Sequence, residues 1–166
     1  MPEGAASDNL LSMKVLHLVV REFYLTIERE KRTIPAGGRV VIHFPEEPCF
    51  VVTQSSAARD CGVRPQMPIA QARDILPDGE YVPADFQGYT KISGELTARL
   101  RELCPFTEQL NFYEWFCDIS EYAEEEMLGE IQGKLRHKIP FDLSLGVSEN
   151  KFLAKLASDL RKPDGF

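Results

Sequence analysis

A single carboxylate at the tip of a predicted hairpin dominates the chemistry that this sequence could perform. Residues 107–120 read TEQLNFYEWFCDIS, and apolar and polar residues alternate on both sides of Glu114. Because a period of two is typical of strands, the segment predicts two short strands that meet near Glu114. Glu114 could bind a divalent cation there. Such a cation needs several oxygen ligands, however, and the flanking residues Tyr113 and Trp115 provide no second carboxylate.

A group of cations near the end of the sequence is the second candidate for chemistry. Lys151 and Lys155 are four residues apart, so they would lie one turn apart on a helix, and Arg161 and Lys162 follow. Such a cluster could contact DNA phosphates. Exposed lysines are more often only solvated, so both interpretations stay open for Lys151 and Lys155.

The overall charge opposes binding to nucleic acid. The 166 residues include 19 Lys and Arg but 26 Asp and Glu, which gives a net charge of −7. Since Lys and Arg supply most of the affinity for a phosphate backbone, a DNA contact would have to come from a local patch.

Several classes of protein are excluded by composition. No apolar run approaches the roughly 18 residues of a membrane span, and the first ten residues are too polar for a signal peptide. We therefore expect a cytoplasmic protein without a membrane partner, preceded by a disordered leader at 1–12. The four cysteines form no CxxC pair and the three histidines have no ligand spacing, which predicts buried free thiols and no zinc site.

The elements that must position these residues follow from hydrophobic periodicity. In chain order we expect a central strand at 13–20, a helix at 22–32 with a Glu28–Arg32 pair, strands at 39–43 and 49–53, short helices from residue 55, a longer helix up to 103, the hairpin, a helix over 128–135, a strand at 143–147 and a closing helix at 150–161. We expect the closing helix to bury its apolar residues Phe152, Leu153, Leu156 and Leu160. This order predicts an α+β fold with an antiparallel-rich sheet and helices packed on one face.

Three segments resemble a known family. The closing residues 143–166, LSLGVSENKFLAKLASDLRKPDGF, resemble a motif of the translesion (Y-family) DNA polymerases that contains Asn-Lys-x-Leu-Ala-Lys, Ala-Ser and Lys-Pro-x-Gly. Residues 51–72, VVTQSSAARDCGVRPQMPIAQA, are similar to the fingers segment of these polymerases. The predicted hairpin resembles a palm hairpin in which Ser-Ile-Asp-Glu precedes a small residue, an aromatic, an aliphatic and Asp. The resemblance extends from residue 14 to residue 166.

The resemblance implies that most of a metal site has been lost. In the family, three carboxylates lie near two catalytic metal ions. Val19 stands where the family has the first Asp, Tyr113 stands where it has the Asp before the Glu, and only Glu114 is kept. Arg21 replaces a further Asp and adds a cation beside the site. We therefore expect no metal cofactor, with Mg²⁺ required only if Glu114 belongs to an unusual site.

Positions that contact the incoming nucleotide in the family are better kept. Tyr24 matches an aromatic residue that contacts the sugar, and Arg59 and Lys162 match contacts to the triphosphate, whereas Ser56 replaces a Tyr. Tyr24, Arg59 and Lys162 are therefore expected, from the resemblance, to contact a nucleotide. Ordinary solvated surface cations are the open alternative for Arg59 and Lys162.

The resemblance also implies a domain division. It places the palm, with its palm-type sheet, at 13–54 and 105–166 and a small helical fingers insertion at 55–104. The sequence stops where the thumb of these polymerases would begin, so we expect the thumb and the little finger to be absent and the chain to be a fragment.

The leading functional hypothesis is a catalytically inactive accessory or scaffold protein in translesion synthesis and the DNA damage response, similar to the polymerase-like subunit of the bacterial mutasome. Its expected partners are DNA, bound through the absent C-terminal domains, a partner translesion polymerase and, as a further candidate, the sliding clamp. One alternative is an active, error-prone lesion-bypass polymerase whose metals use Glu114, Glu22 and backbone carbonyls. Another is a nucleotide-sensing module.

Overall fold

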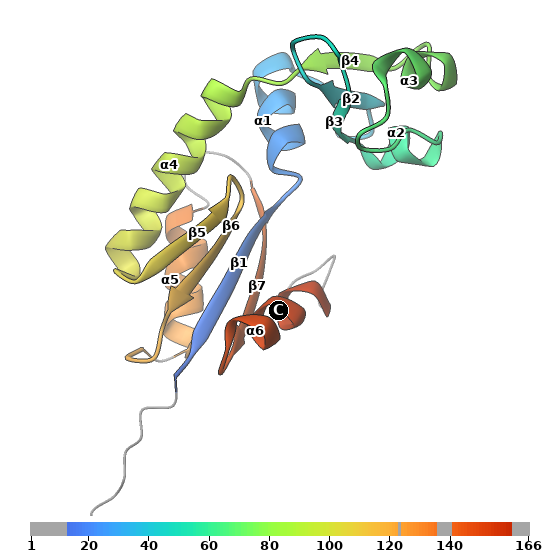
Figure 1. The fold of residues 1–166 in the computed structure, drawn as a ribbon. Coiled ribbons are helices and arrows are strands. Elements are labelled where there is room, and N and C mark those ends of the chain that lie inside the picture. Colours follow the sequence, from blue (N-terminus) through green and yellow to red (C-terminus); the bar gives the residue numbers. More distant parts are fainter. Residues whose placement is uncertain (1–12, 123, 136–140, 161–166) are drawn as a thin grey trace, which may run out of the picture.

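Two β-sheets, joined by two helices, organise the chain in the computed structural model, which describes residues 13–122, 124–135 and 141–160 (Figure 1). The elements are β1 (Val15–Arg21), α1 (Phe23–Arg32), β2 (Val40–His43), β3 (Val51–Gln54), α2 (Ser56–Asp60), α3 (Ile69–Ile75), β4 (Glu80–Pro83), α4 (Phe86–Leu103), β5 (Thr107–Asn111), β6 (Glu114–Asp118), α5 (Glu124–Leu135), β7 (Asp142–Ser148) and α6 (Lys151–Leu160). The expected leader at 1–12 lies outside the described residues, as do Arg161 and Lys162.

The larger sheet has the strand order β5-β6-β1-β7, and its neighbouring strands are antiparallel. The predicted central strand is confirmed, because β1 pairs with both β6 and β7. In this register Val19 lies opposite Glu114 on β6 and opposite Ser144 on β7. The two positions singled out by the sequence are therefore neighbours in the sheet.

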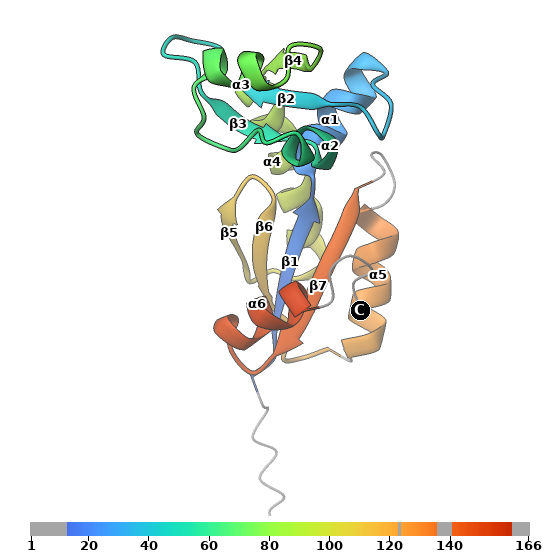
Figure 2. The ribbon, with the colours of Figure 1, turned by 90° about the vertical axis from the view of Figure 1, so that its right-hand side faces the viewer.

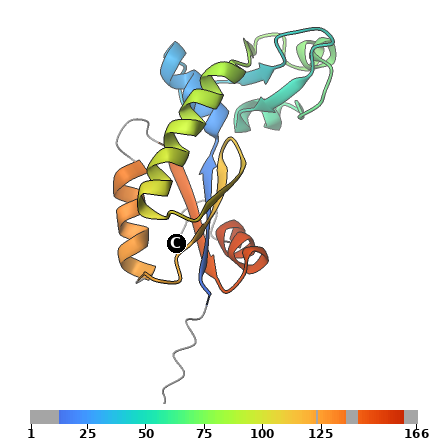
Figure 3. The same cartoon turned by 60° about the vertical axis from the view of Figure 1, so that its left-hand side comes forward.

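The α+β fold class is confirmed, but helices cover both faces of this sheet instead of the single face that was expected (Figure 3). Leu16, Leu18 and Val20 of β1 belong to the main core, which also includes buried residues of α4 and α5. Because side chains alternate along a strand, His17 and Val19 point to the other face. On that face α6 packs against β7 and β1.

The predicted burial of the apolar residues of α6 is wrong. Their exposed fractions are 75% for Phe152, 42% for Leu153, 45% for Leu156 and 74% for Leu160. The buried residues of α6 are instead the small ones, Ala154 and Ser158. The reason is Gly146 of β7, where any Cβ would overlap the backbone of Ala154 and Ser158, so the helix lies directly on the strand.

The smaller sheet has the order β3-β2-β4, with β2 antiparallel to β3 and parallel to β4 (Figure 2). Val40 and Ile42 of β2 face the main core, whereas Val41 faces a second cluster. This second cluster consists of Val41, Val51, Ala58, Val63, Ala72 and Leu76. The strands expected with the palm at 13–54 thus share a sheet with β4, which lies within the expected fingers. The pairing of β2 with β4 is a long-range contact that periodicity does not reveal, and the division into palm and fingers stays a prediction.

Two further expectations can be compared with the described residues. None of the described helices is long and apolar enough to cross a membrane. The four cysteines are free, but only Cys104 and Cys117 are buried, whereas Cys49 is partly exposed and Cys61 is exposed.

Candidate functional site

A pocket of about 500 Å³ lies where β1 passes into α1, between the larger sheet and the smaller one. Among its lining residues are Val19, Tyr24, Arg59 and Tyr113, which the sequence had singled out at separate places. The structure thus brings four of the predicted site residues together. Glu114, Lys151 and Lys155 are not among the lining residues.

Two tyrosines form an aromatic wall of this pocket. The rings of Tyr24 and Tyr113 meet edge to face, with centroids 5.7 Å apart and an interplanar angle of 82°. Burial, and secondarily the neighbouring Tyr113, raises the pKa of Tyr24 to about 12. The Tyr24 phenol is therefore uncharged at neutral pH.

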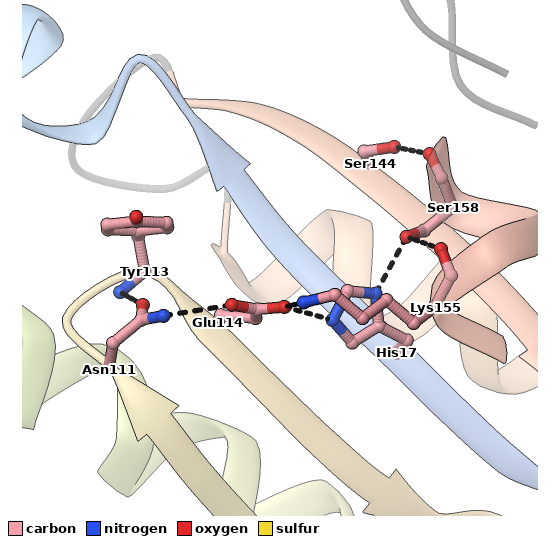
Figure 4. Close-up of polar contacts among 7 residues, drawn as sticks. All are labelled: His17, Asn111, Tyr113, Glu114, Ser144, Lys155 and Ser158. Carbon is pink, nitrogen blue, oxygen red and sulfur yellow. Dashed lines mark hydrogen bonds and ion pairs between the residues drawn. The ribbon is translucent and has the colours of Figure 1, made fainter. Parts of the chain in front are cut away.

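The Glu114 carboxylate is held by three other side chains, while Tyr113 points away from it (Figure 4). Oε2 accepts a hydrogen bond from Asn111 Nδ2 at 2.8 Å. Oε1 accepts one from His17 Nε2 at 2.8 Å and one from the ammonium group of Lys155. Glu114 is only 8% exposed, and a buried carboxylate needs such donors to stay ionised.

The Glu114 carboxylate is stabilised in its charged form. Burial alone would raise the pKa of Glu114, but the hydrogen bonds from Lys155, His17 and Asn111 outweigh it, so the pKa is lowered. Its negative charge is therefore balanced within the protein by the Lys155 ammonium. Lys155 would have to release Glu114 to contact DNA, and that contact stays a prediction.

His17 is held as a neutral imidazole between β1 and α6. Burial is the main cause that lowers the pKa of His17, and it outweighs the opposing effect of Glu114. With its proton on Nε2, the neutral ring donates to Glu114, while Nδ1 lies 2.7 Å from the Ser158 hydroxyl oxygen. The single proton of that hydroxyl is shared between Nδ1 and the Lys155 carbonyl, which lies 2.8 Å from the same oxygen. His17, Asn111 and Ser158 were missed as site residues, because only the fold brings His17 and Asn111 to Glu114, and Ser158 of α6 to His17.

Other charged residues near the site are also paired. Lys151 forms an ion pair with Glu108 on β5, and its ammonium lies 5.6 Å from the centroid of the Phe116 ring. Arg21 pairs with Asp142 at 3.0 Å across the β1–β7 ladder. Lys162, the remaining predicted nucleotide contact, lies outside the described residues.

The described residues do not fit a two-metal site. Val19 and Tyr113 provide no carboxylate, and the carboxylate of Glu22, which lines the pocket, pairs with Arg29 at 2.6 Å. Within the described ranges no cluster of three or more His, Cys, Asp or Glu side chains could hold a metal ion. Hard cations that require several oxygen ligands would find two carboxylates here, Glu22 and Glu114, and both are already bound by protein donors.

Comparisons with known proteins agree on one family. The profile of the impB/mucB/samB family matches residues 18–159. The DNA polymerase IV of Stenotrophomonas maltophilia strain K279a is 32% identical over 157 residues, and that of Alkalilimnicola ehrlichii is 34% identical over 158 residues. These alignments cover 92% of this chain but only 43% and 44% of the two polymerases.

Solved structures give the same result. The crystal structure of DinB from Sulfolobus solfataricus superposes with a TM-score of 0.82 at 26% identity, covering 92% of this chain and 47% of that one. An insertion ternary complex of Dbh DNA polymerase superposes with a TM-score of 0.81, also at 26% identity, and the coverage is again 92% and 47%. The chain thus spans less than half the length of the relatives that it matches.

Proposed function

Because this chain belongs to the impB/mucB/samB family and is a homologue of the Y-family, DNA polymerase IV-like translesion polymerases, we propose that it is a catalytically inactive member that serves as an accessory or scaffold protein in translesion synthesis and the DNA damage response.

One observation carries this proposal. At the pocket where a polymerase of this family would hold its metal ions, the lining residues are Val19 and Tyr113, and the nearby Glu114 is bound by Lys155, His17 and Asn111. Phosphoryl transfer depends on positioning and on charge neutralisation by the metal ions. Loss of one such carboxylate raises the barrier by about 3 kcal/mol or more, and here two are replaced.

The alternative is an active, error-prone lesion-bypass polymerase with a non-standard metal site. The presence of Glu22 at the pocket favours it, since a second carboxylate could join Glu114. Against it, the Glu22 side chain pairs with Arg29, and Glu114 would have to release three donors before it could bind a cation. We therefore prefer the inactive assignment.

The proposed partners follow from this role. DNA is bound mainly by regions that the longer relatives possess outside the matched segment, and Lys151 and Lys155 contribute contacts at most locally. A partner translesion polymerase supplies the catalysis, and the sliding clamp is a further candidate. The aligned segment then acts as a framework that positions these partners.

Primer extension tests the proposal. We expect no nucleotide incorporation with Mg²⁺ or Mn²⁺, whether the chain is tested alone or within the longest natural polypeptide that contains it. The double variant Val19→Asp/Tyr113→Asp should gain Mg²⁺ binding and a low activity, because two added carboxylates join Glu114 to make three. Each single variant should gain neither. Thr53→Asp, which adds a carboxylate to the same pocket from β3, is the matched control.

Two outcomes would overturn the proposal. The first is steady incorporation by the unmodified protein that disappears in Glu114→Ala. The second is full recovery of metal binding by Val19→Asp alone, which would show that Tyr113 does not interrupt the site.

A further inference from the structure

We propose that Cys104 and Cys117 form an oxidation site, at which hydrogen peroxide converts the two thiols into a disulfide that joins the end of α4 to β6. The bond closes a loop of the chain that contains β5 and the tip of the hairpin. Cys117 points into the main core, whereas its neighbour Phe116 belongs to the small cluster beneath α6 on the other face. The inference therefore concerns a different face of the sheet from Glu114 and does not depend on the proposed function.

The fold brings the two thiols together inside the main core. Cys104 directly follows the last residue of α4, and Cys117 lies on β6. Their exposed fractions are 0% and 1%, and the two thiol groups lie within hydrogen-bonding reach of each other. A third sulfur is close by, because Sδ of Met127 on α5 lies 3.6 Å from Sγ of Cys104.

Thr107 of β5 connects the two cysteines. Its hydroxyl oxygen lies 2.6 Å from the carbonyl oxygen of Cys104 and 3.5 Å from Sγ of Cys117. Thr107 is also the partner of Cys117 in the β5–β6 ladder. Paired residues of an antiparallel ladder have Cα atoms about 4.5 to 5.5 Å apart, and a disulfide spans a similar separation. The ladder thus holds Cys117 beside the short segment that carries Cys104.

Cys117 is the thiol that reacts first. A hydrogen bond from Cys104 lowers the pKa of Cys117 although burial opposes this effect, and the same interaction, together with burial, raises the pKa of Cys104. Because the thiolate is the nucleophilic form of cysteine, the lower pKa selects Cys117 for attack on the peroxide.

The oxidation proceeds in two balanced steps. The Cys117 thiolate attacks one oxygen of hydrogen peroxide, so that an S–O bond forms, the O–O bond breaks, and the leaving hydroxide combines with the proton that Cys117 lost. The sulfur of Cys104 then attacks the sulfenic acid of Cys117, an S–S bond forms, the S–O bond breaks, and hydroxide leaves with the proton of Cys104. Two thiols lose two electrons in total, and the peroxide is reduced to two water molecules.

A short exposed segment covers the pair. Pro105 and Phe106 lie between Cys104 and Thr107, and the side chain of Phe106 is 79% exposed. Both residues line a groove of about 840 Å³ together with Thr107 and Cys117. A small displacement of this segment therefore uncovers the sulfur atoms, and the rate of oxidation is limited by that displacement.

Peptide mapping after oxidation tests the proposal. The variant Cys49→Ser/Cys61→Ser keeps only the proposed pair, and the two replaced cysteines are the more exposed ones. After treatment with hydrogen peroxide and blocking of free thiols, cleavage after glutamate releases residues 103–108 and 115–121. We expect the two peptides as one species, lighter by two hydrogen atoms than their sum, which dithiothreitol separates.

The unmodified protein contains its own matched control. Cys49 and Cys61 are nearly as far apart in the sequence as Cys104 and Cys117, and they are more exposed, but the fold does not bury them together. The disulfide between Cys104 and Cys117 should form at least about tenfold faster than any disulfide of Cys49 or Cys61, because proximity favours it. Equal rates would overturn the inference.

Two further arms sharpen the test. Cys104→Ser should stop the reaction at the sulfenic acid of Cys117, which dimedone labels. The oxidised Cys49→Ser/Cys61→Ser protein should unfold at a urea concentration about 0.5 M or more above that of the reduced protein, because the closed loop restricts the unfolded chain. Recovery of Cys104 and Cys117 as separate blocked thiols, or an unchanged or lower midpoint on oxidation, would overturn the inference.

Discussion

At the scale of single residues, Glu114 shows how its neighbours decide what a carboxylate can do. The alternating apolar and polar residues around Glu114 were enough to predict that it lies in a hairpin. The loss of its neighbouring carboxylates could also be predicted, because Val19 and Tyr113 stand where the family has Asp. Its actual donors could not be predicted, because His17, Asn111 and Lys155 come from three different elements. Their convergence depends on strand register and on the placement of α6, which local periodicity does not contain.

The buried pair of His17 and Glu114 predicts a stepwise loss of stability in acid. The pKa of folded His17 lies below the ordinary value of 6.5, so between these two values the unfolded chain binds a proton that the folded chain does not. The free energy of unfolding should therefore be highest above pH 6.5 and fall as the pH drops below it. The lowered pKa of Glu114 adds a second fall that begins near its ordinary value of 4.5.

Urea denaturation from pH 8 down to about pH 3 follows the first phase and the beginning of the second. His17→Gln can still donate to Glu114 but does not titrate, so it should remove the phase below pH 6.5 and keep the more acidic one. His43→Gln is the control, since His43 is only partly buried and its ring bonds to the neighbouring carbonyl of Phe44. An unchanged pH profile in His17→Gln would show that His17 titrates alike in both states.

At the scale of elements, the contact between β7 and α6 depends on the missing side chain of Gly146. A Cβ there would overlap backbone atoms of Ala154 and Ser158, which cannot rotate away as a side chain could. We expect Gly146→Ala to lower the free energy of unfolding by about 1 to 3 kcal/mol, the usual cost of overpacking a closed contact. Chemical denaturation gives this value.

Gly94→Ala is the matched control for this substitution. Gly94 lies within α4 with no atom near the position of an added Cβ, so alanine should stabilise the helix by about 0.5 to 1 kcal/mol. Equal effects of the two substitutions would contradict the close packing of α6 on β7.

Much of the element order could be predicted from the sequence, and the misses have specific causes. β1, the hairpin and the Glu28–Arg32 pair of α1 are confirmed, the last with a nitrogen–oxygen distance of 3.0 Å. β4 was missed because it is short, contains Pro83 and is held by parallel pairing with β2. The buried face of α6 was predicted wrongly, because the close contact with Gly146 of β7 leaves room only for the small residues Ala154 and Ser158 and not for the larger apolar ones.

At the scale of the whole molecule, a net charge of −7 predicts weak binding to DNA. Lys151 and Lys155 are paired with Glu108 and Glu114, so they must release these partners to reach phosphates. We expect dissociation constants of about 10⁻⁴ to 10⁻⁶ M for primer-template DNA, and a slope of log affinity against log salt no steeper than about −4. Fluorescence anisotropy at several salt concentrations measures both.

A charge-reversal pair identifies the contacting face. Lys151→Glu should weaken DNA binding more than Lys91→Glu, which makes the same change on exposed α4, and should reduce the salt slope by about one. Nanomolar binding that is insensitive to salt and to Lys151 would reveal a DNA site elsewhere in the chain.

The second cluster of apolar residues affects how the protein opens. This second cluster, which holds α2 and α3 on the smaller sheet, has six buried residues and is much smaller than the main core. The layer formed by α2, α3 and the smaller sheet should therefore unfold locally, and exchange its amide hydrogens, more readily than the sheet around β1. Arg59 belongs to that layer, so every local opening removes the cation from the pocket while the larger sheet stays folded. Occupancy of the pocket and protection of α2 are then thermodynamically linked, and a bound anion would slow amide exchange in α2 without changing the rates at β1.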